Sequence, residues 1–390
     1  MAGTAKTRTY LDYNATAPLR PEARDATMAA LDLAGNPSSV HAEGRAARLA
    51  VEEARAEIAR LAGSVPRCVT FVSGGAEAAA TALNPAFGAG PGAPPAERLI
   101  VSAGEHPCVL SGHRFPGEAV ETAPLTAAGL IDLDWLTEAC ARPGRILLAL
   151  QGANNETGAI QPVVEAAALV HAAGGHVFCD AVQLAGRADC SLGALGADAL
   201  SLSAHKMGGP KGAGALVTAR PGVSLGDPLI RGGGQERGAR AGTENVAAIA
   251  GFGAAARACS ADRVEEAARL AALRDNLVAA VREAAPDAVV FAEDAPRLPN
   301  TVCFSVPGVE AARLMIALDL AGVAVSSGSA CSSGKVAPSH VLLAMGVGPA
   351  LARGAIRLSL GWASRAEDVM RFGEAFAEAM GRMRRERGAA

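Results

Sequence analysis

The sequence predicts an α/β protein in which a large domain with a mostly parallel β-sheet is joined to a smaller α+β domain. Half of the 390 residues are hydrophobic and only 19% are charged, a globular composition that allows a large core. Short apolar runs alternate with helical patterns, which is typical of βαβ units. The chain is also longer than one usual domain, so two or three domains are expected.

The large domain begins with the clearest amphipathic helix, at residues 40–61, where apolar residues recur at helical spacing with Glu and Arg between them. Residues 88–95 are rich in Gly and Pro and form a loop. Nearly continuous apolar runs are typical of buried strands in a parallel sheet. They predict strands at residues 68–72, 98–102, 145–150, 176–179, 199–203 and 213–218.

The smaller domain follows a long helical stretch at residues 243–285. We place the large domain at residues 15–258 and the small domain at residues 1–14 together with 259–390. The elements expected in the small domain are a strand near residues 300–306, a helix near 309–321, a strand near 355–360 and a closing helix from Arg365.

Charge, hydropathy and cysteine spacing exclude several classes of protein. With 36 basic and 39 acidic residues the net charge is −3, and no basic run offers a surface for nucleic acid. No apolar run reaches the length of a membrane helix, and residues 1–10 lack the apolar region of a signal peptide, so we expect no membrane partner and a cytoplasmic location. The eight cysteines contain no CxxC pair, so neither a metal site nor a disulfide framework is indicated.

Candidate site residues follow the predicted strands, at the edge where such sheets bind ligands. Asp180 directly follows the strand at residues 176–179, and Lys206 follows the strand at residues 199–203. Taken alone, the two side chains could form a simple salt bridge. Pyridoxal 5′-phosphate, however, requires a lysine, an acid for its pyridine nitrogen, an anion pocket and a group stacked on its ring.

The remaining requirements also have candidates. Ser73, Gly74 and Gly75 follow a strand and open a helix, so their backbone N–H groups and the helix dipole favour a phosphate. His106 follows the strand at residues 98–102, where its imidazole could lie over a planar cofactor, although a lone histidine is more often structural. Asn154 and Asn155 follow the next strand, where a side-chain amide could reach a cofactor oxygen or a substrate carboxylate.

Together with several ordered motifs, these spacings resemble the cysteine desulfurases of the NifS and IscS type, which have the class V aminotransferase fold. The resemblance covers nearly the whole chain and implies fold type I of the pyridoxal-phosphate enzymes, with a mostly parallel seven-stranded sheet in the large domain. The motifs that carry it are YLDYNATAP at residues 10–18, NPSS at 36–39 with His41, NNE at 154–156, Asp180 with Gln183, SAHK at 203–206, GGGQER at 232–237 and SSGSACSSG at 326–334.

The resemblance implies a role for each residue around the cofactor ring. Lys206 would bind the cofactor covalently, and Asp180 would pair with its pyridine nitrogen. His106 would stack on the ring and shuttle protons. Gln183 and Asn155 would contact the ring oxygen of the cofactor.

The resemblance also implies how the cofactor phosphate and the substrate are bound. Thr243 would reach the phosphate from a second subunit, which implies a homodimer. Arg357 would pair with the α-carboxylate of L-cysteine, for which a guanidinium is suited, with Asn155 beside it. The other phosphate ligands would be Gly75, Ala76, Ser203 and His205.

Cys331 distinguishes between the reactions that the cofactor permits. It lies in a loop of Ser and Gly, and its thiolate could attack the sulfur of bound L-cysteine, leaving a persulfide on Cys331 and alanine. We expect a nearby imidazole, His106, to favour the thiolate. The alternative is an exposed, unreactive thiol. Cys179 and Cys303 each adjoin a phenylalanine, so we expect them in the core.

The chain departs from the family pattern at two positions. Ala76 stands where the family usually has threonine, and Ala79 where it often has asparagine. One charge-assisted hydrogen bond contributes about 1.5–3 kcal/mol, so the affinity for the cofactor could be lower. Neither change touches Lys206 or Cys331.

Three other hypotheses stand beside the desulfurase, of which two remain open. The first is another class V enzyme, such as a selenocysteine lyase or an aminotransferase. The second is a non-catalytic partner protein that has lost the cofactor, and the third, direct ligation of an iron–sulfur cluster by the cysteines, fails on spacing. A desulfurase needs a sulfur acceptor, and an iron–sulfur scaffold is one candidate. Iron–sulfur assembly, nitrogenase maturation and tRNA thiolation stay open as uses of the sulfur.

Overall fold

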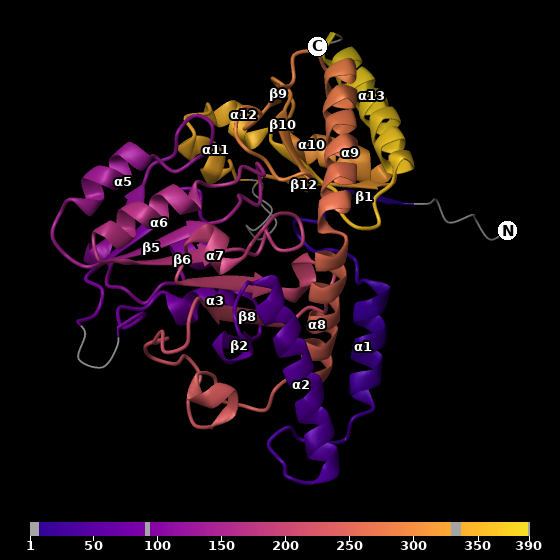
Figure 1. The fold of residues 1–390 in the computed structure, drawn as a ribbon. Coiled ribbons are helices and arrows are strands. Elements are labelled where there is room, and N and C mark those ends of the chain that lie inside the picture. Colours follow the sequence, from indigo (N-terminus) through magenta and orange to yellow (C-terminus); the bar gives the residue numbers. More distant parts are fainter. Residues whose placement is uncertain (1–7, 90–93, 329–336, 389–390) are drawn as a thin grey trace.

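The computed structural model describes residues 8–89, 94–328 and 337–388. Within them, a large central sheet is flanked by helices, and a second group of strands and helices, orange and yellow in Figure 1, packs beside it. Cys331 lies outside the described residues.

The central sheet has seven strands among the described residues, in the spatial order β2-β8-β7-β6-β5-β3-β4. The neighbours from β7 to β4 pair in parallel, whereas β8 is antiparallel to both β7 and β2. The prediction of a mostly parallel seven-stranded sheet is therefore confirmed. The strands are β2 (Val69–Val72), β3 (Arg98–Ser102), β4 (Val120–Ala123), β5 (Ile146–Gln151), β6 (His176–Asp180), β7 (Ala199–Ser203) and β8 (Gly214–Thr218).

Both faces of this sheet are covered, because successive side chains of a strand point to opposite faces. In β5, Leu148 and Leu150 pack in the apolar cluster that contains α2, α5, α6, α7 and α8, whereas Leu147 and Ala149 pack in the cluster that contains α3 and α4. The helices are α2 (Ala42–Leu61), α3 (Gly75–Ala82), α4 (Pro107–Leu110), α5 (Leu133–Cys140), α6 (Val163–Ala172), α7 (Leu192–Leu195) and α8 (Val246–Ala261).

Small residues let three long helices pack closely side by side (Figure 1). A Cβ on Gly253 of α8 would lie 2.5 Å from the Cα of Ala54 in α2. A Cβ on Gly251 would meet Thr27 of α1 (Pro21–Leu31). Any larger side chain at either glycine would therefore push the helices apart.

The second group contains a four-stranded sheet in the order β12-β13-β10-β9 and a parallel pair of β1 with β11. Its apolar cluster includes Leu11 and a stacked pair, Phe372 and Phe376, with ring centroids 5.5 Å apart. The elements are β1 (Thr9–Tyr10), α9 (Arg263–Ala284), β9 (Val289–Val290), β10 (Thr301–Ser305), α10 (Ala311–Leu320), β11 (Val323–Ala324), β12 (Ser326–Ser327), α11 (His340–Ala344), α12 (Pro349–Arg353), β13 (Ile356–Ser359) and α13 (Ala366–Gly388).

The domain boundaries at residues 15 and 259 stay a prediction. Separate apolar clusters for the large sheet and for the elements around α9 and α13 support it. A further cluster joins Ala159, beyond β5, with Cys303 of β10 and Leu342 of α11, so the two groups pack directly on each other.

The sequence analysis missed β4 because only Ala123 of this edge strand is buried, so no apolar run marks it. The predicted helical stretch 243–285 is divided at Asp262, whose φ of −112° interrupts the rod between α8 and α9. No helix in the described part of the chain is long and apolar enough to cross a membrane.

Candidate active site

A cavity of about 600 Å³ opens beyond the ends of β2, β5, β6 and β7. Sequence analysis placed its candidates at this edge, and most of them line the cavity. They are Gly75, Ala76, His106, Asn155, Asp180, Gln183, Ser203, His205, Lys206 and Arg357.

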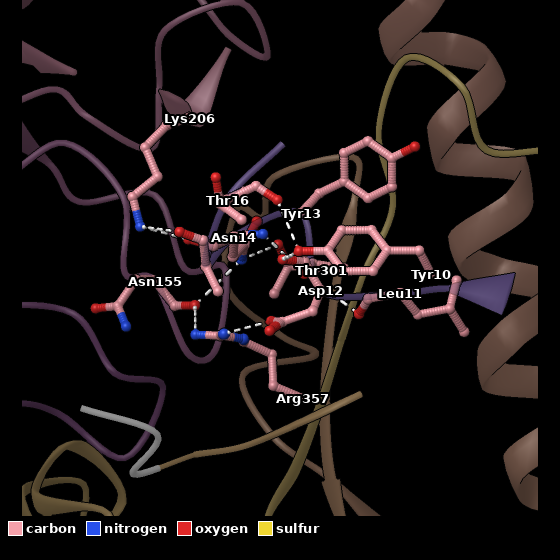
Figure 2. A network of polar contacts seen from close by, with 12 residues as sticks. Tyr10, Leu11, Asp12, Tyr13, Asn14, Thr16, Asn155, Lys206, Thr301 and Arg357 are labelled. Carbon is pink, nitrogen blue, oxygen red and sulfur yellow. Dashed lines mark hydrogen bonds and ion pairs between the residues drawn. The ribbon is translucent and has the colours of Figure 1, made fainter. Parts of the chain in front are cut away.

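Lys206 lies on the short turn that follows β7 (Figure 2). Its Nζ donates to the carbonyl oxygens of Asn14 at 2.7 Å and Ala15 at 3.0 Å. The amine is therefore held at the cavity wall by the N-terminal segment.

Asp180 ends β6, and its carboxylate is fixed by two donors. Oδ1 accepts from the backbone N of Val182 at 3.0 Å and from the Ser201 hydroxyl at 3.0 Å. One donor belongs to the neighbouring strand β7 and the other to the turn after β6, so the carboxylate is held in place at the cavity wall.

The N-terminus of α3 forms the end of the cavity suited to an anion. A Cβ on Gly75 would lie 2.9 Å from a methyl carbon of Val182, so a glycine is needed for this close approach. Backbone N–H groups at a helix N-terminus favour negative charge. Ala79 is fully buried in an apolar cluster, and an asparagine amide there would need a partner that these neighbours do not supply.

Glu77, in the first turn of α3, is an acid beside this anion site. Its carboxylate accepts from the backbone N of Ser73 at 2.7 Å and from Arg240 Nε at 3.1 Å. Burial raises the pKa of Glu77, but these hydrogen bonds and the charge of Arg240 bring that pKa below its usual value. Arg240 thus offsets the negative charge that would oppose a phosphate.

Two histidines on the cavity wall have lowered pKa values. Burial, followed by the charges of Lys206 and Lys211, lowers the pKa of His205 to about 4. Burial is also the largest cause of the lowered pKa of His106, where Lys206 adds to it and Asp180 opposes it. His106 Nδ1 accepts from the backbone N of Cys108 at 3.2 Å, so in this neutral ring the proton lies on Nε2.

Arg357, in β13, is only 4% exposed and reaches the cavity from the second sheet (Figure 2). Nη2 donates to Asp12 Oδ1 at 2.7 Å, and Nη1 donates to the Asn155 carbonyl at 3.1 Å. Its buried Nε has no hydrogen-bond partner within the described residues. The guanidinium therefore keeps N–H donors for a further anion.

Asn155 and Gln183 both line the cavity, but Gln183 is already engaged. Its Oε1 accepts from Arg187 Nη1 at 2.6 Å, and its Nε2 donates to the Asn14 carbonyl at 3.1 Å. One N–H of this amide is left for a ligand.

The structure does not bring Thr243 into the cavity. Thr243 lines a separate hollow of about 190 Å³, which shares Ser73 and Gly212 with the main cavity. The role predicted for Cys331 lies outside the described residues, but Gly328, three positions before it, lines the cavity. Cys179 and Cys303 are fully buried as predicted, and burial raises the pKa of each thiol.

Sequence analysis did not single out four residues that shape the site. Asp12 and Asn14 appeared there only within the motif of residues 10–18, although they bind Arg357 and Asn155. Glu105 is fully buried, with Oε1 accepting from the backbone N of Gln151 at 2.6 Å, and burial raises its pKa well above the usual value. Glu156 is the fourth. Nothing in the pattern of a polar turn distinguishes a buried carboxylate from an exposed one.

The fold and the cavity together define a fold type I enzyme site, with an amine, a carboxylate and a helix N-terminus around one space. Residues 9–372 match the family described as Aminotransferase class-V, and the chain belongs to that family.

Within it, the chain is similar to proteins named as cysteine desulfurases. It is 41% identical over 369 residues to the cysteine desulfurase IscS of Dictyoglomus turgidum, covering 93% of this chain and 92% of that protein. It is 39% identical over 383 residues to the IscS-like cysteine desulfurase of Mycobacterium tuberculosis, covering 96% and 97%. A NifS-like protein from Rickettsia africae superposes with a TM-score of 0.86 at 32% identity, covering 96% of this chain and 100% of that one.

Enzymes of this kind use pyridoxal 5′-phosphate, and the residues present fit it. Lys206 supplies the amine and Asp180 the carboxylate that this cofactor requires. A Cβ on Gly74 would meet nothing within 4 Å, so the start of α3 has open space for a phosphate. Ala76 removes one hydroxyl from that end but leaves the backbone donors in place.

Proposed function

We propose that the protein converts L-cysteine to L-alanine and transfers the sulfur to Cys331 as a persulfide. The observation that carries the proposal is the meeting of Lys206, Asp180 and Arg357 around one cavity whose wall also includes Gly328, close in sequence to Cys331. A solved structure shows SspA in complex with cysteine, and this chain is 30% identical to it with a TM-score of 0.75.

The cofactor, when bound, withdraws electrons from the bonds at the substrate Cα. We assign its phosphate to Gly75, Ala76, Ser203 and His205, with Thr243 of the partner subunit. The ring contacts are assigned to Lys206, Asp180, His106, Asn155 and Gln183.

The chain's own residues then have separate tasks. Arg357 binds the substrate carboxylate, with Asp12 and the Asn155 carbonyl fixing the plane of the guanidinium. Lys206 accepts the Cα proton, and neutral His106 moves a proton at Nε2. The Cys331 thiolate attacks the substrate sulfur, so that an S–S bond forms as the C–S bond breaks, and protonation at Cβ leaves alanine.

Substitution of Cys331 tests the sulfur transfer. Wild-type protein incubated with L-cysteine should form alanine and a persulfide on Cys331, and Cys331→Ser should form neither at more than a small fraction of that rate. Alanine, sulfide and the mass of the Cys331 peptide are measured. Full turnover by the serine variant would favour another class V activity, such as a selenocysteine lyase. Lys206→Ala is the control, because it should abolish the visible absorbance of the bound cofactor.

The assembly and location of the protein are also proposals. We propose that the protein is cytoplasmic, because the seven cysteines in the described part of the chain are free thiols, as expected in a reducing compartment. We propose a homodimer because Thr243 is assigned to the phosphate of the partner subunit. The acceptor of the sulfur is proposed to be a protein of iron–sulfur cluster assembly, following the IscS names of its relatives. Sedimentation tests the homodimer. Trapping of the persulfidated protein with candidate scaffolds tests the sulfur acceptor.

A further inference from the structure

Glu156 is a buried carboxylate beside the cavity that the proposed mechanism does not use. It is 4% exposed and follows Asn155 in the turn after β5. Asn154 fixes this turn, because its Oδ1 accepts from the backbone N of both Glu156 and Thr157 at 2.9 Å. The fixed turn places Asn155 at the cavity and gives Glu156 a different set of neighbours.

Two segments meet at the Glu156 carboxylate. The Ser339 hydroxyl donates to Oε2 at 2.5 Å. A Cβ on Gly328 would lie only 3.0 Å from the same oxygen, so Gly328 approaches it closely. Gly328 and Ser339 stand on opposite sides of Cys331 in the sequence, and both are described. One carboxylate oxygen thus contacts both flanks of the segment that carries the thiol.

The groups that face Glu156 come from three elements. They are Arg357 of β13, Cys303 of β10 and Ser339, which caps α11 by accepting from the backbone N of Leu342 at 3.1 Å. Burial raises the pKa of Glu156 to about 7, more than the Ser339 hydrogen bond and Arg357 lower it. The Cys303 thiol stays neutral because burial, and then Glu156, raise its pKa.

We propose that Glu156 is a positioning residue for sulfur transfer. Its carboxylate accepts the hydrogen bond of Ser339 and lies next to Gly328, and it thereby positions the two residues that flank the Cys331 segment. The inference rests on the proposed function, in which Cys331 accepts the sulfur. Hydrogen bonds to a charged acceptor are roughly twice as strong as neutral ones. Protonation of Glu156, or its replacement by glutamine, therefore weakens the hold on Ser339 without removing the acceptor.

Glu156→Gln in the holoenzyme tests this inference, with two reactions followed side by side. Formation of the Cys331 persulfide from L-cysteine, quenched rapidly and read by mass spectrometry, should slow by about fivefold to tenfold at pH 8. Exchange of the Cα hydrogen of L-alanine with D₂O, which needs the cavity but not Cys331, should stay within about twofold, as should cofactor absorbance. In the wild type, ionisation of Glu156 should add a rise in the persulfide rate near pH 7 to the rise that comes from thiolate formation on Cys331, and Glu156→Gln should lose only the first of these.

The stability of Glu156→Gln distinguishes a positioning role of Glu156 from a merely structural one. Because the pKa of Glu156 is raised on folding, the folded protein binds more protons between the usual carboxyl range and about pH 7, and its stability falls as pH rises through that window. Glutamine does not ionise, so it causes no loss of stability as the pH rises. The urea midpoint at pH 8 should therefore not fall in Glu156→Gln.

Each outcome supports or overturns the inference. An unchanged persulfide rate, or an equal loss in both reactions, would overturn it. Absence of any persulfide on Cys331 in the wild type would instead overturn the proposed function. Ser339→Ala, which leaves Glu156 in place and removes the donor, should also slow only the persulfide reaction, and Ser339→Thr should restore it. These variants decide the matter if Glu156→Gln does not fold.

Discussion

His205 shows how the cavity controls charge at a single residue. It lies next to Lys206, and its Nδ1 is 3.2 Å from the Thr16 hydroxyl. Burial and the two lysines lower its pKa to about 4, so it is neutral at pH 7. A neutral ring adds no further positive charge beside Lys206 and can donate one N–H to a phosphate.

This shift makes the stability of the cofactor-free protein depend on pH. Below about pH 6.5 the unfolded chain protonates His205, while the folded chain does so only near pH 4. Stability is therefore complete above pH 6.5 and falls as pH drops through that window. Urea unfolding at pH 7.5 and 5.0 should show a larger loss for the wild type than for His205→Gln, and equal losses would contradict the assigned shift.

Arg357, to which we assign the substrate carboxylate, is held in place by contacts within the chain. Asp12 supplies a counter-charge at 2.7 Å, which makes burial of the guanidinium tolerable. The Asn155 carbonyl fixes its plane. The buried Nε has no hydrogen-bond partner among the described residues, which is the energetic cost of this arrangement.

At the scale of elements, a buried ion pair fastens the loop between β8 and α8 to the sheet. Arg55 of α2 binds Glu236 through two hydrogen bonds of 2.7 and 2.8 Å, and Glu236 also accepts from the backbone N of Phe71 in β2. Glu236 and Arg237 have φ values of 46° and 58°, a strained conformation for side chains of this size. The same loop carries Thr243.

Glu236→Gln should therefore lower the free energy of unfolding by about 3–5 kcal/mol, because Arg55 is left buried without its main partner. Urea unfolding at pH 7.5 measures the change. The matched control is Glu386→Gln, which breaks the exposed pair with Arg313 and should cost no more than about 1 kcal/mol. Similar losses of unfolding free energy in both variants would show that the buried pair stabilises the fold no more than the exposed pair does.

Elements made of continuous apolar runs were predictable from the sequence. The strands β3 and β7 have the predicted limits, because every residue of β7 and all but the first of β3 are buried. The edge strand β4 was not predictable, since Val120, Glu121 and Thr122 keep some exposure and follow no apolar pattern.

The candidate site was predictable where its residues stand at the end of a strand or in the turn after it, as Asp180 and Lys206 do. Contacts between distant segments were not predictable from the residues themselves. The bond from Lys206 to the Asn14 carbonyl joins two turns 192 positions apart. No local pattern encodes such a distance, so only the motif of residues 10–18 pointed to this segment.

At the scale of the whole molecule, the N-terminal segment connects the two groups of elements. Leu11 packs in the cluster around α9 and α13, whereas Asn14 binds Asn155 beyond β5 and Thr301 of β10. Lys206 and Arg357 are thus set by one segment that touches both sheets (Figure 2). A displacement of that segment would therefore move the side chains of Lys206 and Arg357 together.

Thr243 is the proposed cofactor-binding residue that does not line the main cavity of a single chain. It lies in its own hollow, beside Ser73 and Gly212, and does not line the main cavity. Our hypothesis that it binds the phosphate of the partner subunit predicts that Thr243→Ala weakens cofactor binding. Loss of one hydrogen bond to a charged group corresponds to an affinity about 10- to 150-fold lower.

Mixed dimers decide whether Thr243 acts within its own chain or across the interface. A dimer of one Lys206→Ala chain and one Thr243→Ala chain has one site with both residues intact only if Thr243 crosses to the partner. Alanine formation measured against added pyridoxal phosphate should then reach half the wild-type amplitude with the wild-type midpoint. If Thr243 served its own chain, the only lysine-bearing site would lack it, and the midpoint would shift to that of the Thr243→Ala homodimer. That shift would refute the shared site.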